Sequence, residues 1–152
     1  MRLCTLSAAQ MKEDMPTDAQ IESEIIAKGK TAPRVTPADL QANIVSAHYF
    51  TAWQGAQRSF WDAAPDINEA DGEAELDAYA NNEPSFDGPL PLLTFCVLVL
   101  RNGFTVTGES ACASPENFDP EIGRKIARRN AEQKIWPLMG YALKQDLHNA
   151  SI

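Results

Sequence analysis

The chain has 152 residues, of which 44% are apolar and 22% charged, and it contains three cysteines. This composition indicates one globular domain. No apolar run reaches the ~18 residues that a membrane span needs. We expect neither a secretory leader nor a disulfide framework, because the number of cysteines is odd and their spacing irregular. The net charge of −8 opposes general binding to nucleic-acid phosphates.

The organisation along the chain follows from shifts in periodicity. Residues 1–16 show no periodic pattern, and we expect a loose tail in which Met11 and Met15 are alternative starts to Met1. Residues 17–152 are predicted to form a single α+β domain.

The acidity of the chain is concentrated in one part of that domain. Nine of the 21 acidic residues lie between Ser59 and Leu100, and this window contains no Lys or Arg. We expect an acidic surface insertion at about residues 54–88, with a short helix around Glu73–Tyr79. Residues 62–87 therefore offer one functional alternative, an acidic decoy or interaction surface, although such insertions more often only solubilise a protein.

The first predicted helices begin at threonine caps. Thr17 opens a capping-box pattern, and Gly29 suits the end of the helix that follows. Thr36 precedes a proline at the first helical position, Pro37, where the missing N–H costs nothing. The aromatic run at residues 48–53 is compatible with a continued helix or with a strand.

Asn102-Gly103 between two apolar runs is the strongest local signal in the chain. It predicts an antiparallel hairpin over about residues 92–109, with a type I′ turn whose two central residues both have positive φ. The register expected from this turn pairs Arg101 with Phe104, Val99 with Val106 and Leu100 with Thr105.

The first strand of this hairpin, residues 95–100, is apolar on both faces. It needs cover on both sides, and a two-stranded ribbon alone is only marginally stable. We therefore expect a third strand, supplied either by residues 48–53 or by a second subunit that pairs through the sheet edge to give a homo-oligomer.

A basic helix is predicted to follow the hairpin. Ser114-Pro115 and Asp119-Pro120 each resemble a cap followed by a proline, which indicates two successive helix starts. Pro137 is expected to break or kink the main helix, so that residues 138–147 form a second C-terminal helix. The side chains expected to face inward are Ile122, Ile126, Ala127, Ala131 and Ile135, and those expected to face outward are Arg124, Lys125, Arg128, Arg129 and Lys134.

The junction between the loop and this helix is the best candidate for a ligand site. A helix N-terminus flanked by arginines suits a phosphate or carboxylate group, including that of a nucleotide. The more common role of such a basic stripe is a solvated helix face. The candidate contacts are Glu109, Ser110, Cys112, Ser114, Asn117, Arg124, Lys125, Arg128 and Arg129.

An enzymatic alternative uses the loop cysteine of the same region. Cys112 with His48 as its base would serve a hydrolase or transferase, but no third residue or known motif accompanies the pair. Cys96 lies inside an apolar strand and is expected to be core. The histidines and cysteines show no metal-ligand spacing, so we expect no metal site and no cofactor.

Two long segments resemble a known family. They are TAPRVTPADLQANIVSAHYFTA and LTFCVLVLRNGFTVTGESACASPENFDPEIGRKIARRNAEQKIWPLMGYAL. Both are similar to small bacteriophage and prophage proteins typified by the gene 49 and gene 66 products of enterobacterial phages. Residues 1–16 and 54–89 look less typical of that family.

The resemblance implies a phage protein expressed in the cytoplasm of a bacterial host. It brings no established activity and no catalytic residues. By analogy with other small accessory phage proteins, we expect a non-enzymatic protein that binds a host protein or a small anionic ligand, in host takeover or counter-defence.

Overall fold

The computed structural model describes residues 16–63 and 81–152, and within them the chain has the expected α+β architecture. The elements in chain order are α1 (Asp18–Ala27), α2 (Pro37–Asn43), β1 (Ile44–Thr51), α3 (Ala52–Asp62), the 3₁₀ turn η2 (Leu90–Leu92), β2 (Leu93–Leu100), β3 (Thr105–Ala111), the 3₁₀ turn η3 (Pro115–Asn117) and α5 (Pro120–Asn149). The expected tail at residues 1–15 and the expected helix at Glu73–Tyr79 lie outside the described residues.

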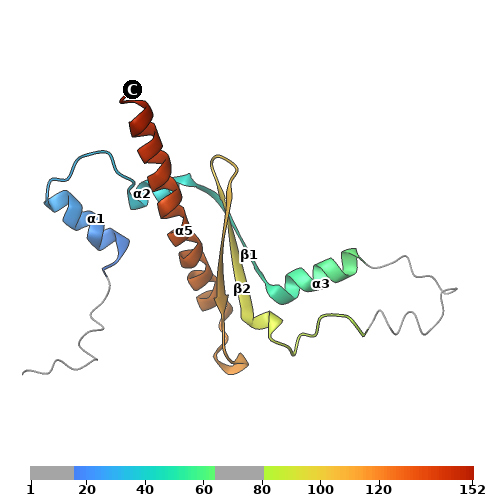
Figure 1. The fold of residues 1–152 in the computed structure, drawn as a ribbon. Helices are drawn as coiled ribbons and strands as arrows, with labels where there is room; N and C mark the ends of the chain where they lie inside the picture. Colours follow the sequence, from blue (N-terminus) through green and yellow to red (C-terminus); the bar gives the residue numbers. More distant parts are fainter. Residues whose placement is uncertain (1–15, 64–80) are drawn as a thin grey trace, which may run out of the picture.

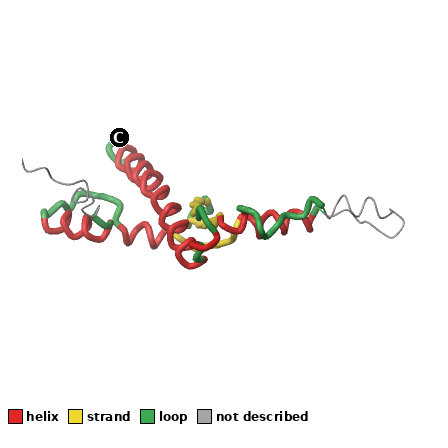
Figure 2. Tube along the Cα trace, turned by 90° about the horizontal axis from the view of Figure 1, so that it is seen from below, coloured by secondary structure: helices red, strands yellow, loops and turns green. Residues whose placement is uncertain are grey.

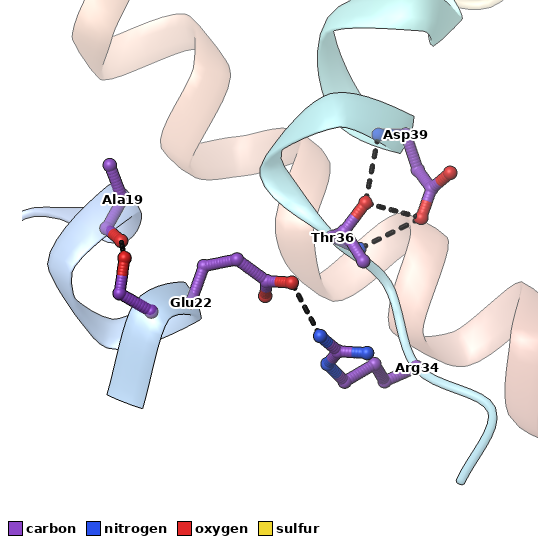
Figure 3. Close-up of polar contacts among 6 residues, drawn as sticks. Ala19, Glu22, Arg34, Thr36 and Asp39 are labelled. Atoms are coloured by element: carbon purple, nitrogen blue, oxygen red, sulfur yellow. Dashed lines mark hydrogen bonds and ion pairs between the residues drawn. The ribbon is translucent and has the colours of Figure 1, made fainter. Parts of the chain in front are cut away.

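The two N-terminal helices begin where the threonine caps predict. Thr17 and Gln20 exchange both bonds of a capping box at α1, and Gly29 follows that helix with a φ of +64°. Thr36 and Asp39 form the same device at α2, and the two hydrogen bonds from Thr36 lower the pKa of the Asp39 carboxyl. Figure 3 shows this cap beside an ion pair between Arg34 and Glu22, which ties α1 to the segment before α2.

The sheet has three antiparallel strands in the order β1-β2-β3. β1 supplies the third strand, and the aromatic run at 48–53 contributes most of its C-terminal half, with Tyr49 opposite Cys96. A third strand is therefore present as predicted, and of the two sources considered the structure shows the chain's own residues.

The hairpin is present, but its predicted register is wrong by one residue. Val99 pairs with Thr105, and Leu98 pairs with Val106. The connection is a three-residue loop, because the Gly103 N–H donates to the Leu100 carbonyl and only Gly103, with a φ of +82°, has positive φ. A turn of this kind places its glycine after the turn residues, whereas a type I′ turn would need positive φ at Asn102 as well. The shift places Leu98 and Val106 together on the face that α5 covers.

α5 packs across one face of the sheet and creates the core. The apolar side chains buried there are Leu40, Cys96, Leu98, Leu100, Val106, Ala127, Ala131 and Ile135. Gly108 of β3 lies directly under the helix, since a Cβ at this position would be 2.2 Å from the Ala127 carbonyl oxygen. Figures 1 and 2 show α5 on one side of the sheet, with α3 leading away from the other.

Three expectations about α5 need correction. α5 is one continuous helix of 30 residues, with Pro137 inside it, so the C-terminal helical pair is wrong. Ile122 is 56% exposed instead of facing inward, because Gly123 takes the position next to the sheet. Arg128 is half-buried instead of fully outward, since it hydrogen-bonds to Glu132 and Gln41.

The first part of the insertion predicted at residues 54–88 is helical. α3 continues the chain as a helix to Asp62, and its capping box between Thr51 and Gln54 is the signal that sequence reasoning missed. The returning chain packs on this helix: the Trp53 indole N–H donates to the Pro84 carbonyl, and Phe86 meets the indole ring edge-on.

Replacing Pro137 by alanine is expected to raise the free energy of unfolding by about 2 kcal/mol. Proline removes one backbone donor inside the helix and crowds the carbonyl four residues earlier, and alanine restores both. Pro137 is exposed, so its removal leaves no cavity. Urea unfolding measures the change, and the exposed substitution Gln133→Ala should alter it by less than about 0.5 kcal/mol. A destabilised Pro137→Ala variant would contradict the role given to Pro137.

Candidate functional site

The loop residues of the predicted site contact one another and do not line a common pocket. The Cys112 thiol donates to the Ser114 carbonyl over 3.2 Å, and the Asn117 side-chain amide donates to the Ser114 hydroxyl over 3.1 Å. On β3, the Glu109 carbonyl accepts a hydrogen bond from Asn130, while Ser110 lies opposite Thr94. These contacts organise the loop and hold the β3 edge against α5.

The basic side chains of the predicted site do not form one patch. Lys125 pairs with Glu121 over 2.6 Å, and this bond together with the charge of Glu121 raises the pKa of Lys125. Arg128 pairs with Glu132, and hydrogen bonds to Tyr49 and Glu132 raise the pKa of Arg128. Within residues 16–63 and 81–152, Arg124 and Arg129 form no ion pair.

The structure does not bring Cys112 and His48 together. His48 lies opposite Val97 on β1 and shares a 3.0 Å hydrogen bond with the Ser46 hydroxyl. Cys112 follows the end of β3, on the far side of β2, and its N–H donates to the Leu92 carbonyl. Cys112 lies beside Leu92 and His48 opposite Val97, five residues further on, so the two positions are about 17 Å apart along the sheet, well beyond hydrogen-bond distance. Burial also raises the pKa of the Cys96 thiol, which therefore stays protonated in the core.

A small pocket does lie at the end of the predicted junction, and we refer to it as the junction pocket. It has a volume of about 190 Å³ and sits where β1 and β2 meet the starts of α3 and α5. Its lining residues are Phe50, Thr51, Gln54, Thr94, Phe118, Pro120 and Arg124. Only Arg124 was among the predicted contacts.

Thr94 is the unusual member of this pocket. The residue is 3% exposed, and its hydroxyl oxygen has no hydrogen-bond partner among the described residues. On the helix side it lies against Gly123, where a Cβ would approach the hydroxyl oxygen to 3.0 Å. A buried hydroxyl without a partner loses its bonds to water and gains none in return, which costs about 1–3 kcal/mol. A hydroxyl in this state gains stability from any polar group that can reach it.

The electrostatics of the junction pocket favour an anion. Among the described residues, Arg124 is the only charged side chain in the lining. α3 begins at Ala52, directly after its cap Thr51, and presents the positive end of its dipole here. The expected contribution of α5 amides is not available, because the Asp119 carboxylate already accepts hydrogen bonds from the Glu121 and Ile122 N–H groups.

A larger groove of about 550 Å³ lies between α2, the hairpin turn and the C-terminal half of α5. It contains Arg34 and Arg101 but also Asp39 and Asp146. Charges of both signs give it no preference for an anion, so it does not compete with the junction pocket for that role.

Other site classes find less support in the described part of the chain. No three His, Cys, Asp or Glu side chains there are grouped in a way that could hold a metal ion. No helix in that part is long and apolar enough to cross a membrane. Most of the acidic segment 62–87 lies in residues 64–80, outside the described residues.

Comparison with known proteins places the chain in a family. Residues 35–147 match the model of the phage protein (N4 Gp49/phage Sf6 gene 66) family. The chain belongs to this family of phage proteins. No curated protein and no solved structure matches it. In this phage protein the matched region contains the whole sheet and every residue of the junction pocket.

Proposed function

We propose that this phage protein is an accessory protein that acts by binding, and that it holds a small oxyanion, a phosphate or carboxylate group, in the junction pocket. The binding serves the phage in host takeover or counter-defence. The oxyanion belongs to a small nucleotide-like ligand or is displayed on a host protein, and the two sources share the same recognition chemistry.

The observation that carries this proposal is the buried, unpartnered Thr94 hydroxyl in a pocket whose only charge is Arg124. A bound oxyanion would accept two hydrogen bonds from the planar guanidinium of Arg124, and a rotation of the Thr94 side chain away from Gly123 would add a third from its buried hydroxyl. The proposal thus satisfies a polar atom that the described residues leave unsatisfied.

The size of the pocket limits how much of a ligand it can take. Pockets for drug-sized ligands measure about 300–1,000 Å³, and the junction pocket has about 190 Å³. It therefore suits the anionic group itself, with the rest of the ligand outside, against Phe118 and the first turn of α3.

Replacing Thr94 by valine tests the proposal with two readouts of opposite sign. Valine keeps the shape and β-branching but removes the unpaired hydroxyl, so the ligand-free protein should become more stable by about 1 kcal/mol. Affinity for inorganic phosphate and for a nucleoside monophosphate should fall about fivefold, because one hydrogen bond is lost.

Urea unfolding and titration calorimetry measure these two changes. A variant that is stabilised and binds more weakly cannot owe its weaker binding to misfolding. Unchanged affinity for both probes would show that Thr94 does not contact the anion. The matched control is Thr105→Val, an exposed threonine at the far end of the sheet, which should leave phosphate affinity unchanged.

A further inference from the structure

One face of the sheet is largely uncovered within the described part of the chain, with only the first turn of α3 against Phe50 at one end, and we call it the outer sheet face. It consists of the residues that alternate with the buried ones: Ser46, His48 and Phe50 of β1, Leu93, Phe95, Val97 and Val99 of β2, and Thr105, Thr107, Glu109 and Ala111 of β3. α5 covers the opposite face, and α3 leads away from the sheet on the outer side (Figure 1).

The centre of this face is apolar. Phe50 stacks on Phe95 with ring centroids 5.5 Å apart and is still 39% exposed. Val97 and Val99 continue the apolar strip along β2, and both are only half-buried. A half-solvated antiparallel sheet normally alternates apolar and polar residues. β2 does not, so its outer side chains have the composition of a covered surface.

The charge pattern restricts what can cover it. The one Lys, Arg, Asp or Glu residue of the face is Glu109, whose carboxylate lies 3.6 Å from Lys134 of α5 at the sheet edge. A nucleic acid or a charged peptide would find no complementary charge at its centre. A second copy would present the same apolar and uncharged centre. Two such faces can therefore meet without repulsion between like charges, even though each chain carries a net charge of −8.

The edge of β3 is a less suitable interface than the face. Antiparallel alternation points the Glu109 carbonyl toward the free edge, where Asn130 of α5 donates a hydrogen bond to it over 2.8 Å. That contact, with Lys134 beside it, hinders the addition of a strand at β3. The apolar side chains of β2 lie on the face and not at this edge.

We propose that the outer sheet face binds a second copy of this chain, giving a two-fold homodimer in which two three-stranded sheets pack face to face between two α5 helices. Sheets pack about 10 Å apart in such sandwiches, with their inner side chains interdigitated. Three strands paired over about seven residues present a flat footprint of about 300 Å². This is less than half of the about 800 Å² per partner of a standard interface, so we expect a weak dimer with a Kd of about tens to hundreds of micromolar.

The test places a charge on either side of Val97, at positions exposed on the surface of one chain. Thr107→Lys on β3 and His48→Lys on β1 both lie opposite Val97. Both side chains are exposed, so neither substitution disturbs the core. Thr31→Lys, in the exposed segment between α1 and α2, is the matched control.

Sedimentation velocity of the full chain at increasing micromolar concentrations measures the mass. The wild type and Thr31→Lys should approach twice 16.7 kDa. Each variant next to Val97 should dissociate with a Kd at least about tenfold higher, because an unpaired charge becomes buried. A wild type that stays monomeric throughout would overturn the proposal. So would a dimer that only one of the two face variants weakens, since that result would indicate pairing through a single edge strand.

Discussion

Replacing Gly108 by alanine is expected to lower the free energy of unfolding by about 3–5 kcal/mol, the largest change we predict for any single substitution in this protein. The added Cβ would lie 2.2 Å from the Ala127 carbonyl oxygen and 2.3 Å from the Ala131 amide nitrogen. Both contacts are with the helix backbone, which cannot rotate away as a side chain could. α5 would have to move from the sheet by about 1 Å or more to restore normal contact distances.

The cost follows from what α5 contributes to the core. Ala127, Ala131 and Ile135 are fully buried against the sheet, and a displaced helix would leave gaps beside all three. A domain of this kind has about 5–15 kcal/mol of stability in total, so the substitution would remove a large part of it. Urea unfolding followed by circular dichroism measures the loss.

Gly140→Ala is the matched control for this substitution. Gly140 lies in α5 itself, and a Cβ there would meet nothing within 4 Å. Because alanine is the better helix former, this variant should gain about 0.5–1 kcal/mol. If Gly108→Ala were as stable as the wild type, the close packing of α5 on β3 would be refuted.

Replacing Arg124 by glutamine is expected to weaken the binding of inorganic phosphate by about tenfold to a hundredfold. A hydrogen bond to a charged group contributes about 1.5–3 kcal/mol, and glutamine retains neither the charge nor the planar fork. Arg124 is exposed and forms no ion pair with the described residues, so its loss should leave stability within about 0.5 kcal/mol of the wild type. Titration calorimetry at fixed ionic strength measures the affinity.

Arg129→Gln serves as the control for the charge itself. Arg129 lies on the same helix, is exposed and forms no ion pair with the described residues, but it does not line the junction pocket. It should alter phosphate affinity by less than about twofold, through the screened long-range field alone. Equal losses in the two variants would assign the effect to general charge and not to the pocket.

Much of this fold can be predicted from local signals, because those signals are themselves hydrogen-bonding devices. Thr17 and Thr36 cap their helices as their sequence patterns indicate. Thr51 does the same for α3, although the aromatic run around it is compatible with a helix or a strand. Asn102-Gly103 predicts a hairpin but not the length of its loop. The loop is one residue longer than expected, and this shifts the pairing of the two strands by one residue.

Pro137 shows where a local rule yields to its surroundings. Proline is disfavoured inside a helix, yet α5 continues through it. Buried side chains as far as Ile135 hold the N-terminal half of α5 on the sheet, and this packing offsets the cost of the proline. The inward position of Gly123 likewise depends on Thr94 of the facing strand, which helical periodicity alone does not reveal.

The junction pocket could be predicted only in part, because it is assembled from separate stretches of the chain. Arg124 and the loop before α5 were accessible to sequence reasoning as a capped helix with basic residues. Thr94 was not, since a threonine at the start of an apolar strand resembles ordinary strand sequence. Only the pairing of Thr51 with Thr94, and the approach of α5 to both, bring these groups together.

The most direct test of anion binding in the junction pocket is a titration of the ¹⁵N-labelled full chain with inorganic phosphate, followed by amide chemical shifts. We expect saturable shifts centred on Thr94, on the first turn of α3 and on residues 118–124, and in Arg124→Gln the same shifts should need about ten to a hundred times more phosphate. Saturable shifts confined to other surfaces, or none at phosphate concentrations well above those that saturate simple anion sites, would contradict the account.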